Sequence, residues 1–199
     1  MSTEQPNPTY GLVLAGGESR RMGRDKALLA REGRSQLEYM VELLATVTDR
    51  VFVSARRSQR DDAERNRFPQ IVDRYDGIGP VAGILSALEE HPGVNWLVVA
   101  CDLPNVDAAT LEYLLQNHSE ANQFTAFRSS YDGLPEPLCA IYPAGSDAAI
   151  RSFVDGGFVC PRKILIRSDT ALLEQPNPHA LDNVNTPEDL EDSVLEAAS

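Results

Sequence analysis

The stretch YGLVLAGGESRRMGRDK, residues 10–26, places a short apolar run directly before two glycines and a group of basic residues. The apolar run, residues 10–15, is uniformly apolar rather than alternating, and it stops at Gly16 and Gly17. A short run of this kind is typical of a strand that is buried on both faces. The stretch therefore predicts a parallel sheet that helices cover on both sides.

The rest of the chain alternates between strand and helix patterns over its first two-thirds. This order predicts an α/β fold: a doubly wound, mostly parallel sheet with helices on both faces, in three layers. We expect strands at 51–53, 70–72, 96–100, 124–127, 138–142 and 164–166. We expect helices over about 35–49, 80–90 and 145–155, after Asp107 as a cap, and from Pro187 to the end. The polar stretch 56–67 suits a loop or a short exposed helix.

The length of 199 residues suits one domain of ordinary size. Residues 1–9 have neither basic residues nor an apolar core, so we expect a flexible lead, not a signal peptide, before a single domain over 10–199. No apolar stretch approaches the roughly 20 residues that span a bilayer. The three cysteines form no C-x-x-C pair and lie in or beside apolar runs, which favours buried free thiols in the cytoplasm.

The formal net charge of −12 argues against general nucleic-acid binding, which needs a broad basic surface. Segment 18–31 departs from this balance, because basic residues outnumber the two acidic ones, Glu18 and Asp25. The basic residues are Arg20, Arg21, Arg24, Lys26 and Arg31. A local group of cations on an acidic protein suits a small polyanionic ligand.

The loop after the first strand has the composition of a phosphate site. Its glycines let backbone N–H groups approach an anion, and Arg21 and Lys26 can reach phosphate oxygens. It is not a Walker-type P-loop, because Arg24 follows Gly23, and it lacks the G-x-G-x-x-G dinucleotide pattern. A turn whose glycines serve only geometry would leave the cations unexplained.

Three more polar segments follow strands or precede a helix. Asp102 follows Cys101 at the end of the strand at 96–100. By itself it suits a helix cap or a turn as well as Mg²⁺, but its place on the same sheet edge as the first loop favours Mg²⁺. Asp73, followed by the glycine turn at 79–83, could contact a nucleotide's base or ribose, or simply lead into a helix. Asn183 and Asn185 would point the same way from an extended segment and could recognise a ligand or make Asx turns.

Together these motifs resemble the signature of the molybdenum cofactor guanylyltransferases. The matching segments are LAGG-x-S-x-RMG-x-DK at 14–26, GP-x-AG at 79–83, CD-x-P at 101–104, PL-x-A at 137–140 and N-x-NTPE-x-L at 183–190. The resemblance covers about residues 10–195. The first motif is long and specific, and the others support it by their order.

The resemblance implies transfer of GMP from GTP to the terminal phosphate of molybdenum-bearing molybdopterin, with release of pyrophosphate and with Mg²⁺ as cofactor. It implies GTP contacts from Leu14, Ala15, Gly16, Gly17, Lys26, Asp73 and Asp102, with Asp102 also holding Mg²⁺. It implies molybdopterin contacts from Asn183 and Asn185. We assign the catalytic roles to Arg21, Lys26 and Asp102. Expected protein partners act in cofactor biosynthesis or molybdoenzyme maturation, and neither nucleic acid nor a membrane is expected.

The chain departs from the family pattern at two positions. Arg56 follows Ser54-Ala55 where members often have Asn, which removes a neutral contact to the nucleotide, and Ala100 precedes Cys101-Asp102 where members tend to have proline. One alternative is a cytidylyltransferase that acts on molybdopterin or on a sugar or polyol phosphate. Such relatives tend to have Ala-Ala-Gly in place of Ala15-Gly16-Gly17. The other alternative is a nucleotide or cofactor carrier without catalytic activity.

Overall fold

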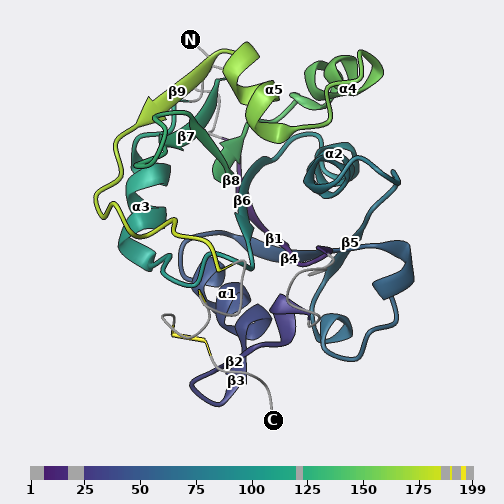
Figure 1. Ribbon diagram of the computed structural model, residues 1–199. Coiled ribbons are helices and arrows are strands. Elements are labelled where there is room, and N and C mark those ends of the chain that lie inside the picture. The colour runs from purple at the N-terminus through teal and green to yellow at the C-terminus, as the bar shows by residue number, and fades with distance from the viewer. Residues whose placement is uncertain (1–6, 18–24, 120–122, 185–188, 190–193, 196–199) are drawn as a thin grey trace.

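The computed structural model describes residues 7–17, 25–119, 123–184, 189 and 194–195 (Figure 1). Within this part of the chain the middle layer is a seven-stranded sheet of order β5-β4-β1-β6-β8-β7-β9. Its strands are β1 (Thr9–Leu14), β4 (Arg50–Ala55), β5 (Gln70–Val72), β6 (Asn95–Ala100), β7 (Phe124–Arg128), β8 (Pro135–Tyr142) and β9 (Thr170–Leu173).

The sheet is mostly parallel, as the sequence predicted. β1 runs parallel to β4 on one side and to β6 on the other, and β5 extends the parallel part beyond β4. β8 is antiparallel to both β6 and β7, whereas the edge strand β9 is parallel to β7. The carboxyl ends of β1, β4, β5 and β6 therefore meet at one edge of the sheet.

Helices cover both faces of the sheet (Figure 1). α1 (Gln36–Ala45) and α3 (Ala108–Gln116) lie on one face, and α2 (Pro80–Glu90), α4 (Asp147–Asp155) and α5 (Pro161–Arg167) lie on the other. Neighbouring β1 residues show why two layers are needed, because Leu12 and Val13 are both 0% exposed and belong to different core clusters. The doubly wound, three-layer α/β architecture is confirmed.

Smaller elements connect these layers. They are the hairpin β2 (Ala30–Arg31) and β3 (Arg34–Ser35) and the 3-10 turns η1 (Lys26–Leu28), η2 (Arg57–Gln59) and η3 (Arg65–Arg67). Asp107 caps α3 as expected, since its Oδ1 accepts a hydrogen bond of 2.8 Å from the Thr110 N–H. In the described part of the chain no helix combines the length and the apolar character that crossing a membrane requires.

The prediction of a strand at residues 164–166 is wrong, because this segment lies inside α5. A three-residue apolar run has no measurable period, so its composition suits a strand and a helix equally. The helix is favoured by Pro161 at its first position and by one buried face, since Ile164 and Leu165 are 1% exposed whereas Ile166 is 50% exposed. The strand that pairs with β7 comes later, at β9.

Two further expectations need adjustment, and one is not tested. α1 ends at Ala45 instead of 49, because the chain turns at Thr46 to enter β4. Cys101 and Cys139 are buried free thiols as expected, but Cys160 is exposed because it lies at the start of α5, outside the core. The helix expected from Pro187 lies outside the described residues except for Asp189.

Candidate active site

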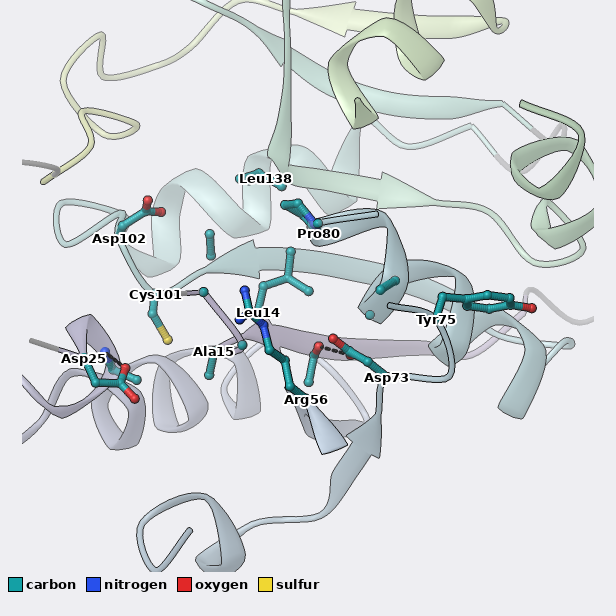
Figure 2. A pocket seen from close by; sticks show the side chains of 18 of the residues that line it. Leu14, Ala15, Asp25, Arg56, Asp73, Tyr75, Pro80, Cys101, Asp102 and Leu138 are labelled. Atoms are coloured by element: carbon teal, nitrogen blue, oxygen red, sulfur yellow. Dashed lines mark hydrogen bonds between the residues drawn. The ribbon is translucent and has the colours of Figure 1, made fainter. Parts of the chain in front are cut away.

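A cavity of about 650 Å³ lies beyond the carboxyl ends of β1, β4, β5 and β6 (Figure 2). Open α/β sheets bind their ligands at this edge, and the volume is within the range of small-molecule sites. Its walls come from the segments that follow these strands and from the start of α2. They include Leu14, Ala15, Gly16, Gly17, Asp25, Ser54, Arg56, Asp73, Gly79, Pro80, Gly83, Cys101, Asp102 and Leu138.

Asp73 forms a buried acidic wall of the cavity at the end of β5. The Ser54 hydroxyl donates a hydrogen bond of 2.9 Å to Asp73 Oδ1, and the carboxylate-bearing residue is only 9% exposed. Burial raises the pKa of Asp73 to about 6, while the Ser54 hydrogen bond and the positive charge of Arg56 oppose the rise. Asp73 is therefore a carboxyl group whose protonation changes close to physiological pH.

Gly16 brings the loop after β1 close to Arg56 and Asp73. A Cβ atom on Gly16 would lie 3.4 Å from Arg56 Cγ and 3.7 Å from Asp73 Oδ2, so a side chain here would come into van der Waals contact with both residues. A Cβ on Gly17 would meet nothing within 4 Å. Figure 2 shows the Arg56 side chain extending between Asp25 and Asp102 at one end of the cavity and Asp73 at the other.

Gly83 allows α2 to pack directly against β4 below the cavity. A Cβ on Gly83 would lie 2.2 Å from Ser54 Oγ, 3.0 Å from Ser54 Cβ and 3.1 Å from Leu14 Cδ2. Real Cβ atoms do not approach other atoms so closely, so only glycine fits without a shift of the helix or the strand. Gly83 thus leaves room for Ser54, whose hydroxyl binds Asp73.

The loop that carries Asp102 is held from two sides. The Gln36 side chain, 0% exposed at the start of α1, donates a hydrogen bond of 3.2 Å from Nε2 to the Cys101 carbonyl. From the C-terminal segment, the Val184 N–H donates a hydrogen bond of 3.0 Å to the Asp102 carbonyl. These contacts fix the backbone at Cys101 and Asp102, and so hold the half-buried residue Asp102 at the cavity wall.

Arg65 is the main residue of this region that sequence reasoning missed. It lies within the stretch expected to be a loop or an exposed helix, yet it is 1% exposed. Its guanidinium contacts the Ala15 carbonyl and the Asp25 carboxylate, both of which line the cavity. Nothing in the local sequence distinguishes Arg65 from Arg67, which is exposed on the same turn, so burial here depends on distant segments.

Most of the predicted site residues that the structure describes come together. Leu14, Ala15, Gly16, Gly17, Asp73 and Asp102 all line the one cavity. Lys26 is the first residue of η1, beside Asp25, but its side chain lies outside what the structure describes. Arg21 and Asn185 also lie outside the described residues. Asn183 is exposed and is not one of the cavity's lining residues.

The acidic residues of the cavity offer oxygen ligands to a metal ion. In the described part of the chain no group of three or more His, Cys, Asp or Glu side chains could hold a metal. Mg²⁺, however, is usually held by one or two carboxylates together with substrate phosphates and water. Asp102 at the cavity wall has the hard oxygen donors that such a site needs, so the residues present fit Mg²⁺.

Comparison with known proteins identifies the family. The MobA-like NTP transferase domain family matches residues 11–170. A molybdenum cofactor guanylyltransferase of Pseudomonas fluorescens is 32% identical over 187 residues, which are 92% of each chain. This chain belongs to the molybdenum cofactor guanylyltransferase family. It is therefore a nucleotidyltransferase of molybdenum cofactor biosynthesis, and the resemblance found in its motifs is confirmed.

One further relative and one solved structure place the chain in context. A molybdenum cofactor biosynthesis bifunctional protein of Synechocystis is 40% identical over 185 residues, but this chain spans only 52% of that protein's length. A solved structure, the molybdopterin-guanine dinucleotide biosynthesis protein A of Archaeoglobus fulgidus, has a TM-score of 0.77 at 24% identity and covers 92% of this chain and 95% of its own. That likeness supports the fold.

Proposed function

We propose that this protein transfers GMP from GTP to the terminal phosphate of molybdenum-bearing molybdopterin and releases pyrophosphate. The observation that carries the proposal is that family motifs far apart in the sequence line one cavity at the carboxyl edge of the sheet. The names of the similar proteins, which are molybdenum cofactor guanylyltransferases, agree with it.

In the proposed reaction, an oxygen of the molybdopterin phosphate attacks the α-phosphorus of GTP. The bond between the α-phosphorus and the oxygen that bridges to the β-phosphate breaks, and pyrophosphate leaves with that oxygen. The attacking phosphate is already ionised near neutral pH, so no side chain has to remove a proton. The protein's contribution is to position the two substrates and to neutralise charge.

We assign nucleotide binding to the Leu14–Gly17 backbone, Lys26, Asp73 and Asp102. Arg21 and Lys26 neutralise the triphosphate and the departing pyrophosphate. Asp102 is the residue that would hold Mg²⁺, which when bound neutralises charge on the phosphate oxygens. Asp73, when ionised, accepts hydrogen bonds, which suits the N–H donors of a guanine base.

The acceptor side of the site is assigned to Asn183 and Asn185. Asn183 precedes Val184, whose N–H binds the Asp102 carbonyl, so this segment reaches the loop that carries the proposed metal ligand. We further propose that the protein acts in the cytoplasm and hands its product to proteins of cofactor biosynthesis or molybdoenzyme maturation.

A nucleotide panel tests the function directly. Thermal unfolding is measured with GTP, CTP, ATP and UTP, each with and without Mg²⁺, and pyrophosphate release is then assayed with the stabilising nucleotide and molybdenum-loaded molybdopterin. A ligand at 100 times its Kd stabilises the folded state by about 2.7 kcal/mol, so GTP with Mg²⁺ should raise the Tm clearly. Stabilisation by CTP alone would assign the chain to the cytidylyltransferases, and binding without pyrophosphate release would make it a carrier.

A further inference from the structure

Arg65 carries a buried positive charge beside the cavity without lining it. The residue lies on η3 and is 1% exposed, so its guanidinium is almost completely removed from water. Burying a charge is expensive unless hydrogen bonds and opposite charges compensate for it. We therefore ask which hydrogen bonds and opposite charges stabilise the buried guanidinium of Arg65.

The guanidinium binds two residues of the cavity wall and one residue of its own segment. Nη2 donates to the Ala15 carbonyl at 2.6 Å and Nε to the same oxygen at 3.3 Å. Nη2 also lies 2.6 Å from Asp25 Oδ2, and Nη1 lies 3.2 Å from Asp62 Oδ1. One planar group thus satisfies a carbonyl and two carboxylates that approach it from different directions.

The two cavity residues that Arg65 joins flank the phosphate-binding motif. Ala15 lines the cavity (Figure 2) and directly precedes Gly16 and Gly17, which also line it. Asp25 directly precedes Lys26 and organises η1, because its Oδ1 accepts the Ala27 N–H at 3.1 Å and its carbonyl accepts the Leu28 N–H at 3.0 Å. A single side chain therefore binds the chain on both sides of residues 16–24.

The same contact controls charge at the cavity. Asp25 lines the cavity, and a carboxylate there would repel a triphosphate. The positive charge of Arg65 at 2.6 Å compensates for it.

We propose that Arg65 is a positioning residue for the phosphate groups of the nucleotide: it holds the Ala15 backbone and the start of η1 in register and neutralises Asp25, without touching the substrate. The inference rests on the proposed function in one respect, namely that the motif binds a nucleoside triphosphate. It adds a residue from a segment outside the family motifs. Because the guanidinium reaches three acceptors as a fork, a lysine at this position would keep the charge but lose most of the geometry.

The test compares Arg65→Met and Arg65→Lys with wild type and with the matched control Arg67→Met. Arg67 lies on the same turn and binds Glu38 and Glu64 instead of the cavity residues. Affinities for GTP and for GMP are measured by calorimetry with Mg²⁺, together with kcat and KM for pyrophosphate release. GMP lacks the β- and γ-phosphates, so it separates phosphate positioning from general damage to the site.

We expect R65M to weaken GTP binding about tenfold or more, which is about 1.4 kcal/mol, and to weaken GMP binding no more than about threefold. R65K should fall between R65M and wild type, and R67M should match wild type. Equal losses for GTP and GMP, or normal GTP binding by R65M, would overturn the positioning role. If R65M does not fold, R65K alone decides between these outcomes. Failure of the wild-type protein to bind any nucleoside triphosphate would instead refute the proposed function.

Discussion

Lys26 follows Asp25 and begins η1, the element that Arg65 anchors. A lysine here would neutralise the charge that develops as pyrophosphate leaves, so Lys26→Ala should lower kcat for pyrophosphate release on the order of 100-fold or more. Stability should change by no more than about 0.5 kcal/mol, because the role proposed for Lys26 is in substrate binding and not in packing. Lys163, the chain's other lysine, is exposed on α5, and Lys163→Ala is the matched control. Near-normal turnover of K26A would remove Lys26 from the mechanism.

Asp73 couples stability to pH. Its pKa rises from 3.8 to about 6 on folding, so the native state binds more protons than the unfolded state between these values, and stability falls as pH rises through this window. Asp73→Asn keeps an oxygen acceptor for the Ser54 hydroxyl and removes the charge. We expect D73N to be more stable than wild type above about pH 6, by at most about 3 kcal/mol, and the difference to vanish near pH 4.

Urea unfolding at several pH values between 4 and 8 measures this difference. Asp61→Asn, at an exposed carboxylate, removes the same charge from the surface and separates burial from net charge. A stability gain for D73N that is the same at pH 4 and pH 7 would contradict the account.

The sequence alone predicted that Asp73 and Asp102 lie at the same edge of the sheet. Each comes at the end of an apolar strand, and the carboxyl ends of parallel strands meet at one edge. The sequence was not enough to find Arg65 or Gln36. Both are polar residues that are buried against segments distant in the sequence: Arg65 binds Ala15, 50 residues away, and Gln36 binds Cys101, 65 residues away. A local pattern carries no information about contacts of that kind.

At the scale of elements, the contact between α2 and β4 supports the cavity floor. Gly83→Ala would place a methyl group 2.2 Å from Ser54 Oγ and force the helix and strand apart. Overpacking of this kind costs about 1–3 kcal/mol, and we expect that loss in urea unfolding together with weaker GTP binding, because Ser54 positions Asp73.

A double-mutant cycle locates the clash. Ser54→Ala removes the hydroxyl but leaves Ser54 Cβ at 3.0 Å, so G83A should cost less in the S54A background than in wild type. Gly93→Ala is the control, because a Cβ there meets nothing within 4 Å. Strictly additive effects of S54A and G83A on stability would contradict this account, because they would show that the added methyl group does not clash with the Ser54 hydroxyl.

Elements with a long or clearly bounded pattern were predicted well, and the three-residue strand β5 was also found at its expected position, whereas α5 and β9 were not predicted. The apolar strand β6 and the proline-started helix α2 match their expected residues closely. α5 was predicted as a strand because its apolar run is three residues long, and β9 was missed because all four of its residues are only half-buried at the sheet edge. Whether such segments become helix or strand depends on what they pack against, which here is β8 for α5 and β7 for β9.

At the scale of the whole molecule, the parallel strands give the sheet two unlike ends. The carboxyl end carries the cavity. Toward the other end, Tyr10, Phe52, His91 and Trp96 pack their rings with centroids 5.2–5.9 Å apart and close the core. This division separates a stabilising end from a binding end, so a ligand at one end has no direct contact with the other.

Hydrogen exchange should report this division when nucleotide binds. With GTP and Mg²⁺ we expect slower exchange at the amides of residues 14–17, 54, 56, 79, 82–83 and 100–102, because these residues line the cavity. Amides around the aromatic group should change little, apart from the uniform protection that any stabilising ligand gives to amides that exchange by global unfolding. A comparison of GTP with GMP, each at saturation, separates the part of the cavity that binds the β- and γ-phosphates from the part that binds the rest of the nucleotide. Protection that GTP adds over GMP should be concentrated at residues 14–17. Added protection concentrated instead around Phe52 and Trp96 would place the triphosphate at the wrong end of the sheet.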